Sequence, residues 1–401
     1  MTAASATPLS CSPSRVIAQG HSLRSERASG REEPRRWAWM DNLRVAVIAG
    51  VIVEHVATAY VLDIDWYYEE RSSNAVTEAI VGAAILPAAL FAMAVLFLVA
   101  GLLSARSLAR KGPWPYVRDR LLRLGAPLIA FTFVIGPLTS LVGQRGEGDS
   151  SADDVGSFLI EKMQDADTGP LWFVTALLVF SIAYGAWRWA RPAGLTASGP
   201  LRPAHLVTAV AAIVVGSFVV RLKWPFTADT PFDLNLWEWP QMATLFAFGA
   251  LAGERGWLDP IPDWLRRACG RASIIGALGL VFIVGAVALA GDGDPFLGGW
   301  HLQALAEPTT EATIAVAMSV WLVGWFGRRW NHQTTLARSL GRASFAAYII
   351  HPPVLVMLSA GLSSVAIAAE VKFVAVAVLG VASSFTLGWY MTTVRPLARV
   401  L

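Results

Sequence analysis

The stretch Asp41-Asn42-Leu43-Arg44, followed by an apolar run that ends at Glu54-His55, decides how this chain folds. Arg44 and His55 are eleven residues apart, which is close to three helical turns, so a helix places both side chains on one face. At 1.5 Å per residue they lie ~16 Å apart along that face. Ionisable side chains are costly inside a membrane, so this pair indicates a functional site that faces a bundle interior.

The composition is that of a polytopic membrane protein. Of the 401 residues, 55% are hydrophobic and 15% are charged, whereas soluble domains carry about 25% charged residues. The net charge of +3 comes from arginines that flank apolar runs, so membrane topology explains it better than nucleic-acid binding does. The two cysteines, Cys11 and Cys269, predict neither a disulfide framework nor a metal cluster.

The apolar runs predict an all-α, polytopic membrane helical bundle of about ten transmembrane helices. The expected spans are residues 43–62, 78–104, 121–142, 170–189, 204–221, 238–254, 272–290, 310–327, 340–361 and 366–392. Lys and Arg gather in alternate connections, and the intervening 143–169 and 291–307 loops are acidic, so both termini are expected to be cytoplasmic. The 143–169 segment is expected to be the longest external loop.

The first residues differ from the rest. Residues 1–37 are rich in Ser, Ala and Arg and lack an apolar core, which predicts a disordered, basic cytoplasmic tail rather than a signal peptide. Residues 38–401 then form the membrane domain.

Two groups of side chains in the first half of the chain could carry chemistry. His55 has a pKa near neutrality when unperturbed, so it can take a proton from a hydroxyl and return one to a leaving group. Arg120 and Arg123 share a face at i, i+3, and two guanidinium groups on one face suit phosphates, although such a cluster is also an ordinary positive-inside anchor. Asp292, Asp294 and His301 are too loosely spaced in a glycine-rich loop to indicate a metal site, so no metal is expected.

A second polar stripe lies late in the chain. Ser344, Tyr348 and His351 follow an i, i+4, i+7 pattern and therefore share a helix face. Pro352 and Pro353 come directly afterwards and should kink that helix, because proline removes a backbone donor. His351 is therefore either a second catalytic or substrate-binding group or a brace for the kink.

Together these residues resemble acyltransferase family 3, the polytopic membrane O-acyltransferases of bacteria. The resemblance rests on five segments in order along about residues 38–395: Arg44 with His55, the small-residue turn Phe97–Leu102 (with Ala100 where serine is common), Arg120 with Arg123, Leu171-Trp172-Phe173, and Ser344 with Tyr348 and His351. Asp-Asn-Leu-Arg and Tyr-x-x-His-x-Pro look most similar to the branch that contains the periplasmic glucan succinyltransferase.

The resemblance implies a multi-pass protein of the bacterial inner (plasma) membrane that moves an acyl group from cytoplasmic acyl-coenzyme A to a hydroxyl, usually of a carbohydrate, at the outer face. The acceptor would be a glycan, a lipid-linked or a small hydroxylated molecule, and no bound cofactor or nucleic acid is expected. Arg44, Arg120 and Arg123 would bind the donor, His55 would be the general base, and His351 and Tyr348 would orient the acceptor or stabilise the oxyanion.

Two other classes of protein are compatible with ten spans. A transporter could export a sugar or lipid without chemistry, but the sequence shows no inverted repeat, and the arginines gathered on the cytoplasmic side suit a donor with phosphates. A scaffold or receptor would leave Arg44 and His55 replaceable without loss of function.

Overall fold

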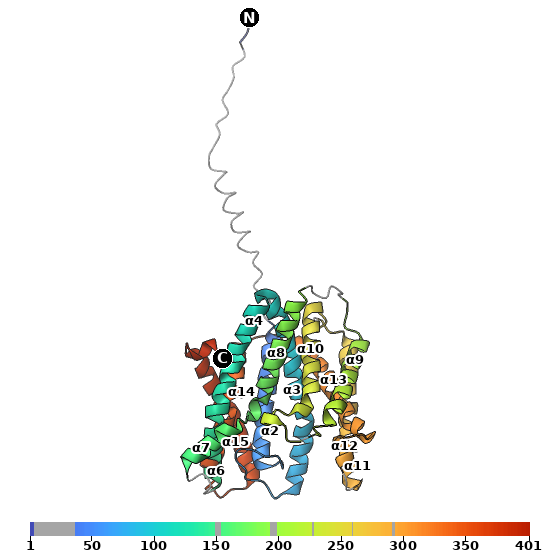
Figure 1. The fold of residues 1–401 in the computed structure, drawn as a ribbon. Helices are drawn as coiled ribbons and strands as arrows, with labels where there is room; N and C mark the ends of the chain where they lie inside the picture. The colour runs from blue at the N-terminus through green and yellow to red at the C-terminus, as the bar shows by residue number, and fades with distance from the viewer. Residues whose placement is uncertain (4–36, 149–153, 193–198, 227, 259, 291–292) are drawn as a thin grey trace. The chain divides into compact units, whose positions relative to one another are not determined.

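A computed structural model describes residues 1–3, 37–148, 154–192, 199–226, 228–258, 260–290 and 293–401. Apart from residues 1–3 and 37, the tail predicted for residues 1–37 lies outside the described residues. Residues 38–401 form one unit in which long helices lie side by side and alternate in direction (Figure 1). The described residues contain helices and no strand, which confirms the predicted all-α membrane bundle.

The longer helices are α2 (Ala38–Tyr60), α3 (Ala75–Lys111), α4 (Pro113–Arg120), α6 (Gly136–Glu147), α7 (Val155–Asp165), α8 (Trp172–Ala190), α9 (Pro203–Arg221), α10 (Trp239–Arg255), α11 (Asp263–Ala290), α13 (Ala306–Arg329), α14 (Thr335–Leu362) and α15 (Ala369–Thr393). The short helices α5 (Ala126–Ala130) and α12 (Asp294–Leu297) complete the set. Two π-helical turns, Leu121–Gly125 and Phe131–Ile135, join α4, α5 and α6 into one continuous rod. Nine rods among the described residues are long and apolar enough to cross a membrane.

The sixth predicted span is α10, which has 17 residues and is shorter than those nine. Its direction follows from its contacts. The His205 ring at the start of α9 stacks on Trp257, just after the end of α10, with 4.3 Å between ring centroids. The Tyr184 hydroxyl near the end of α8 donates to Glu254 near the end of α10 over 2.7 Å. Helix α10 therefore runs antiparallel to α9 and parallel to α8, as an alternating ten-helix arrangement requires.

Small residues let α3 and α10 approach closely. A side chain on Gly101 of α3 would lie 2.0 Å from the Phe246 carbonyl oxygen of α10, and one on Gly249 would lie 2.0 Å from the Leu98 carbonyl oxygen. Glycine at helix crossings allows such backbone contact in membrane proteins. The small-residue segment Phe97–Leu102 therefore packs α3 on α10.

The segment 143–169, which was expected to be the longest external loop, contains helical structure. Helix α6 continues to Glu147, and α7 occupies most of the described remainder. The Asp154 side chain caps α7 by accepting hydrogen bonds from the backbone N–H groups of Gly156 and Ser157. Phe158 of α7 is buried against Leu141 of α6. Asp154, one of the residues that suggested a loop, therefore begins a helix, since aspartate is a good N-cap.

The first residues of α2 bind the connection between α13 and α14. The Asn42 amide donates to the carbonyl oxygens of Trp330 (2.7 Å) and His332 (3.0 Å). The Gln333 amide donates to the Asp41 carboxylate over 3.0 Å. Helices α2 and α14 therefore begin at the same end of the bundle, which we call the basic end because Arg44 lies there.

Candidate active site

The two predicted histidines meet inside the bundle. His55 lies 17 positions after the start of α2, and His351 lies 16 positions after the start of α14. Because both helices start at the basic end, both histidines lie ~25 Å along them. Their ring centroids are 5.0 Å apart. His351 is fully buried and His55 is partly buried.

Backbone hydrogen bonds fix which ring nitrogen carries the proton in each neutral imidazole. His55 Nδ1 lies 2.8 Å from the Val51 carbonyl oxygen, and His351 Nδ1 bonds the Tyr348 carbonyl oxygen. A carbonyl can only accept, so each Nδ1 donates and each Nε2 keeps its lone pair. His351 Nε2 is buried and has no hydrogen-bond partner among the described residues. The site therefore offers proton acceptors on two neighbouring imidazoles.

The prolines after His351 explain one of these hydrogen bonds. Helix α14 runs unbroken from Thr335 to Leu362 with Pro352 and Pro353 inside it. Pro352 has no N–H, so the Tyr348 carbonyl four residues earlier loses its helical donor. His351 Nδ1 bonds that carbonyl instead. His351 thus satisfies the backbone at the prolines through Nδ1 while its Nε2 stays available, and the two predicted roles are compatible.

Trp66, in the segment 61–74 that follows α2, packs over the histidines. Its ring centroid is 4.5 Å from that of His55 and 6.5 Å from that of His351. The segment is anchored by the buried Lys372 ammonium of α15, which donates to the Glu70 carboxylate over 2.6 Å. Burial and the nearby carboxylates of Asp167 and Asp233 raise the pKa of the neighbouring Tyr67, which therefore stays a neutral phenol. The segment 61–74 thus closes the end of the site opposite the basic end.

Tyr348 is close to the histidines, but its hydroxyl is engaged elsewhere. The hydroxyl donates to the Pro170 carbonyl oxygen, in the turn that opens α8. The Phe173 ring packs against Tyr348 with 5.7 Å between centroids, and Phe97 packs against Phe173 with 4.6 Å. The motifs around residues 97, 171–173 and 348 therefore form one wall beside the histidine pair.

Replacing Tyr348 with phenylalanine is expected to lower the thermal stability of the protein and to have little effect on its activity. The change removes one buried hydrogen bond and leaves the Pro170 carbonyl unsatisfied, at a cost of about 1–3 kcal/mol. Thermal unfolding of the purified protein in detergent measures that loss. We expect the activity of the folded fraction to fall by less than about tenfold, the scale of one hydrogen bond. A loss of several hundredfold in the folded protein would instead show a direct part for the hydroxyl in the reaction.

The three predicted arginines lie at the basic end in different surroundings. Arg44 lies 4.0 Å from the Asp41 carboxylate and is close enough to Arg120 for the two charges to interact. The Arg120 guanidinium also lies over the Tyr116 ring, 5.2 Å from its centroid. Arg123 is exposed and binds the Asp119 carboxylate over 3.2 Å. Arg123 lies within the π-helical turn that follows Arg120, and both Arg120 and Arg123 are close enough to the Asp119 carboxylate for their charges to interact with it.

Sequence reasoning missed a buried ionic cluster between α9 and α13. Arg221 bonds Glu307 and lies 2.6 Å from a Glu311 carboxylate oxygen, and the Arg221 and Glu311 side chains are each 2% exposed. The available signal was an arginine that ends one apolar run and two glutamates at i, i+4 around the start of another, because charges inside spans need partners. Trp66 was missed since it lies outside every apolar run.

The architecture and the site define a polytopic membrane protein with a buried histidine pair at one end of the bundle and arginines at the other. A family model, described as an acyltransferase domain, matches residues 37–393. The chain therefore belongs to the membrane acyltransferase family 3. No curated protein and no solved structure matches it. Within the part of the chain that the structure describes, no group of His, Cys, Asp and Glu side chains could hold a metal ion.

Proposed function

We propose that this acyltransferase moves an acyl group from acyl-coenzyme A to a hydroxyl group, and that His55 is its general base. The observation that carries the proposal is the pair of imidazoles with 5.0 Å between ring centroids, each of which donates Nδ1–H to a backbone carbonyl and keeps a lone pair on Nε2. Two such hydrogen-bond acceptors suit a substrate that carries a transferable proton, and an alcohol is such a substrate.

The donor would enter from the basic end, which the arginine distribution favours as the cytoplasmic side. Arg44 and Arg120 would bind its phosphates, with Arg123 at the exposed edge, since guanidinium groups suit phosphate oxygens. Arg44 lies ~16 Å before His55 along α2. An extended pantetheine arm could bridge that distance and bring the thioester carbonyl to the histidines.

The reaction balances with these residues alone. His55 Nε2 takes the hydroxyl proton while the hydroxyl oxygen forms a bond to the thioester carbon. The tetrahedral oxyanion then collapses, the C–S bond breaks, and the proton on His55 passes to the departing thiolate. His351 Nε2 would orient the acceptor by accepting a hydrogen bond from another of its donor groups, because the reacting hydroxyl has one proton and gives it to His55. Neither His351 in this tautomer nor the Tyr348 hydroxyl, which is bonded to Pro170, has a free proton for the oxyanion.

The family resemblance suggests a bacterial plasma-membrane enzyme whose acceptor is a glycan, a lipid-linked or a small hydroxylated molecule. A transporter is the rival class. It would need no base inside the bundle, whereas the fully buried His351 Nε2, which has no partner among the described residues, favours a site where a proton is exchanged.

Incubation with acyl-coenzyme A that is isotopically labelled in the acyl group tests the proposal. Membranes that contain the protein are expected to transfer the label to an envelope glycan, lipid or secreted metabolite, and mass spectrometry identifies the added group and the acceptor together. Membranes without the protein are the control. Label that stays on the thioester, with a glycan or lipid carried across the membrane, would favour the transporter.

A further inference from the structure

The proposed reaction creates a negative charge that no group assigned so far can bind. When the acceptor oxygen bonds the thioester carbon, the carbonyl oxygen becomes an oxyanion, which enzymes stabilise with hydrogen-bond donors fixed in place beforehand. His55 and His351 use their Nδ1–H groups on backbone carbonyls, and the Tyr348 hydroxyl donates to Pro170. The donor to the oxyanion must therefore be another group beside the histidines.

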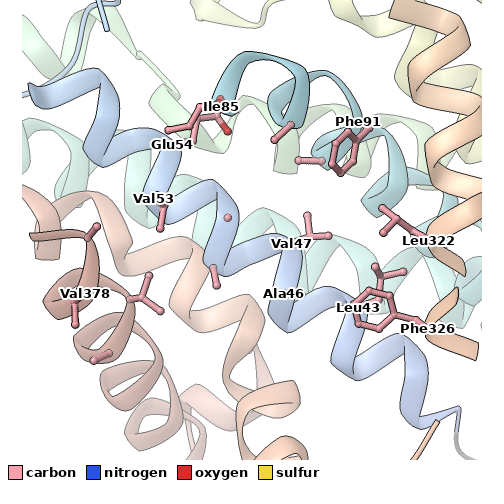
Figure 2. Close-up of a pocket in the computed structure, with 17 residues that line it drawn as sticks. Leu43, Ala46, Val47, Val53, Glu54, Ile85, Phe91, Leu322, Phe326 and Val378 are labelled. Carbon is pink, nitrogen blue, oxygen red and sulfur yellow. The ribbon is translucent and has the colours of Figure 1, made fainter. Parts of the chain in front are cut away.

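An apolar groove along α2 is a separate feature and does not supply this donor. It has a volume of about 770 Å³ between α2, α3, α13 and α15 and ends at Glu54 and Ile85 (Figure 2). Neither His55 nor His351 is among the residues that line it. An oxyanion that forms at His55 therefore lies outside this Glu54 groove.

Trp66 has an unused hydrogen-bond donor next to both histidines. Among the described residues, the aromatic rings other than the two imidazoles that pack on this pair are those of Trp66 and Tyr348. The Trp66 ring centroid is 4.5 Å from that of His55 and 6.5 Å from that of His351. Its backbone N–H donates to the Glu69 carboxylate, but its indole N–H donates to no group that the structure describes. An indole nitrogen is a donor only, so this proton is available in every protonation state of the site.

The segment 61–74 holds Trp66 in place without help from a substrate. The backbone N–H of Glu70 donates to the Ala59 carbonyl oxygen at the end of α2 over 2.9 Å. The Glu70 carboxylate accepts a hydrogen bond from the buried Lys372 ammonium over 2.6 Å. A donor that is held in advance needs no reorganisation when charge develops, which is the condition for effective oxyanion stabilisation.

Tyr67, the next residue, has a hydroxyl group that lies elsewhere. Its ring packs against the Trp66 ring at an interplanar angle of 70°, with 5.1 Å between centroids. Its hydroxyl lies against Gly169, in the turn that opens α8, because a Cβ atom on Gly169 would be 2.1 Å from the Tyr67 oxygen. Tyr67 therefore supports the indole ring, whereas Trp66 packs on the histidines.

We propose that Trp66 is a catalytic residue of the acyl transfer, and that its indole N–H donates a hydrogen bond to the oxyanion of the tetrahedral intermediate. The inference rests on the proposed function and adds the donor that this reaction needs. The indole proton stays on nitrogen throughout, so the transfer of the acceptor proton to His55 and then to the departing thiolate is unchanged. The hydrogen bond lowers the barrier because it is stronger to the oxyanion than to the neutral thioester.

The test replaces Trp66 with benzothienylalanine, in which a sulfur atom takes the place of the indole N–H and the bicyclic shape is kept. The full-length protein in nanodiscs is assayed with labelled acyl-coenzyme A. We expect kcat to fall about 10²- to 10³-fold, the usual loss of one oxyanion donor. The KM for acyl-coenzyme A and the melting temperature should stay unchanged, because the oxyanion is absent from the ground state. Trp66→Phe, which also lacks the N–H, should lower kcat at least as far.

Two further variants serve as comparisons. Trp300 is 82% exposed, and benzothienylalanine at that position should leave the rate of transfer unchanged. Tyr67→Phe removes a hydroxyl from the same segment and keeps the ring that supports Trp66. It should lower kcat by less than about tenfold, the scale of one hydrogen bond.

Two outcomes would overturn the inference while leaving the proposed acyltransferase activity intact. Transfer at the unchanged rate by the protein with benzothienylalanine at position 66 would show that the indole ring only packs over the site. A larger loss of kcat in Tyr67→Phe than in that protein would assign the oxyanion to the Tyr67 hydroxyl. Absence of transfer by the unchanged protein would instead overturn the proposed function, and the inference with it.

Discussion

His55→Asn is expected to lower the rate of acyl transfer by about 10²- to 10⁴-fold, the usual contribution of a general base. Asparagine can keep the hydrogen bond to the Val51 carbonyl through its amide N–H, but it has no counterpart of the basic Nε2. The variant should therefore fold and bind the donor normally. Initial rates with labelled acyl-coenzyme A and the purified protein in nanodiscs measure the loss.

His332→Asn is the matched control, because the His332 side chain is exposed in the connection between α13 and α14. It should transfer the acyl group at the rate of the unchanged protein. Transfer by His55→Asn within about tenfold of that rate, with an unchanged melting temperature, would assign the base to another residue, of which His351 is the nearest.

Arg221→Met is expected to cause the largest loss of stability, about 3–5 kcal/mol, because removing one partner of a buried ion pair leaves the others unpaired. Arg221 and Glu311 are each 2% exposed, and Glu307 is 11% exposed. The loss should appear as a lower melting temperature in detergent. Replacing Arg221, Glu307 and Glu311 together with methionine should recover most of it, since well-packed apolar residues substitute for buried ion pairs at little cost.

Lys162→Met is the control for Arg221→Met. The Lys162–Asp165 pair has an N–O separation of 3.8 Å, and its side chains are 35% and 54% exposed. Surface pairs of this kind contribute about 0–1 kcal/mol. If both variants lost the same small amount of stability, the Arg221 cluster would not hold α9 against α13.

Helical periodicity made the individual polar stripes predictable. Arg44 and His55 share a face of α2, and Tyr348 and His351 share a face of α14, because spacing along one helix fixes which side chains lie together. The fold class followed from the apolar runs in the same way. The helix ends were not predictable from the apolar runs. Helix α3 continues to Lys111, beyond the apolar run that was expected to end at residue 104. Hydrogen bonding of the backbone carries a helix past its apolar stretch.

Contacts between segments that are distant in sequence were not predictable. The 5.0 Å approach of His55 to His351 depends on how α2 and α14 are tied together, and the place of Trp66 depends on the Glu70–Lys372 ion pair. Neither pairing leaves a periodic pattern in a single sequence. The Glu54 groove was hidden for the same reason, because four helices contribute to it.

The hydrogen bonds of Asn42 to the Trp330 and His332 carbonyls have a mechanical consequence. They join α2 to the start of α14 at the end opposite the histidines, like the closed end of a pair of tweezers. The imidazoles lie ~25 Å farther along the same two helices. The hydrogen bonds of Asn42 therefore fix the ends from which α2 and α14 bring His55 and His351 to the same depth.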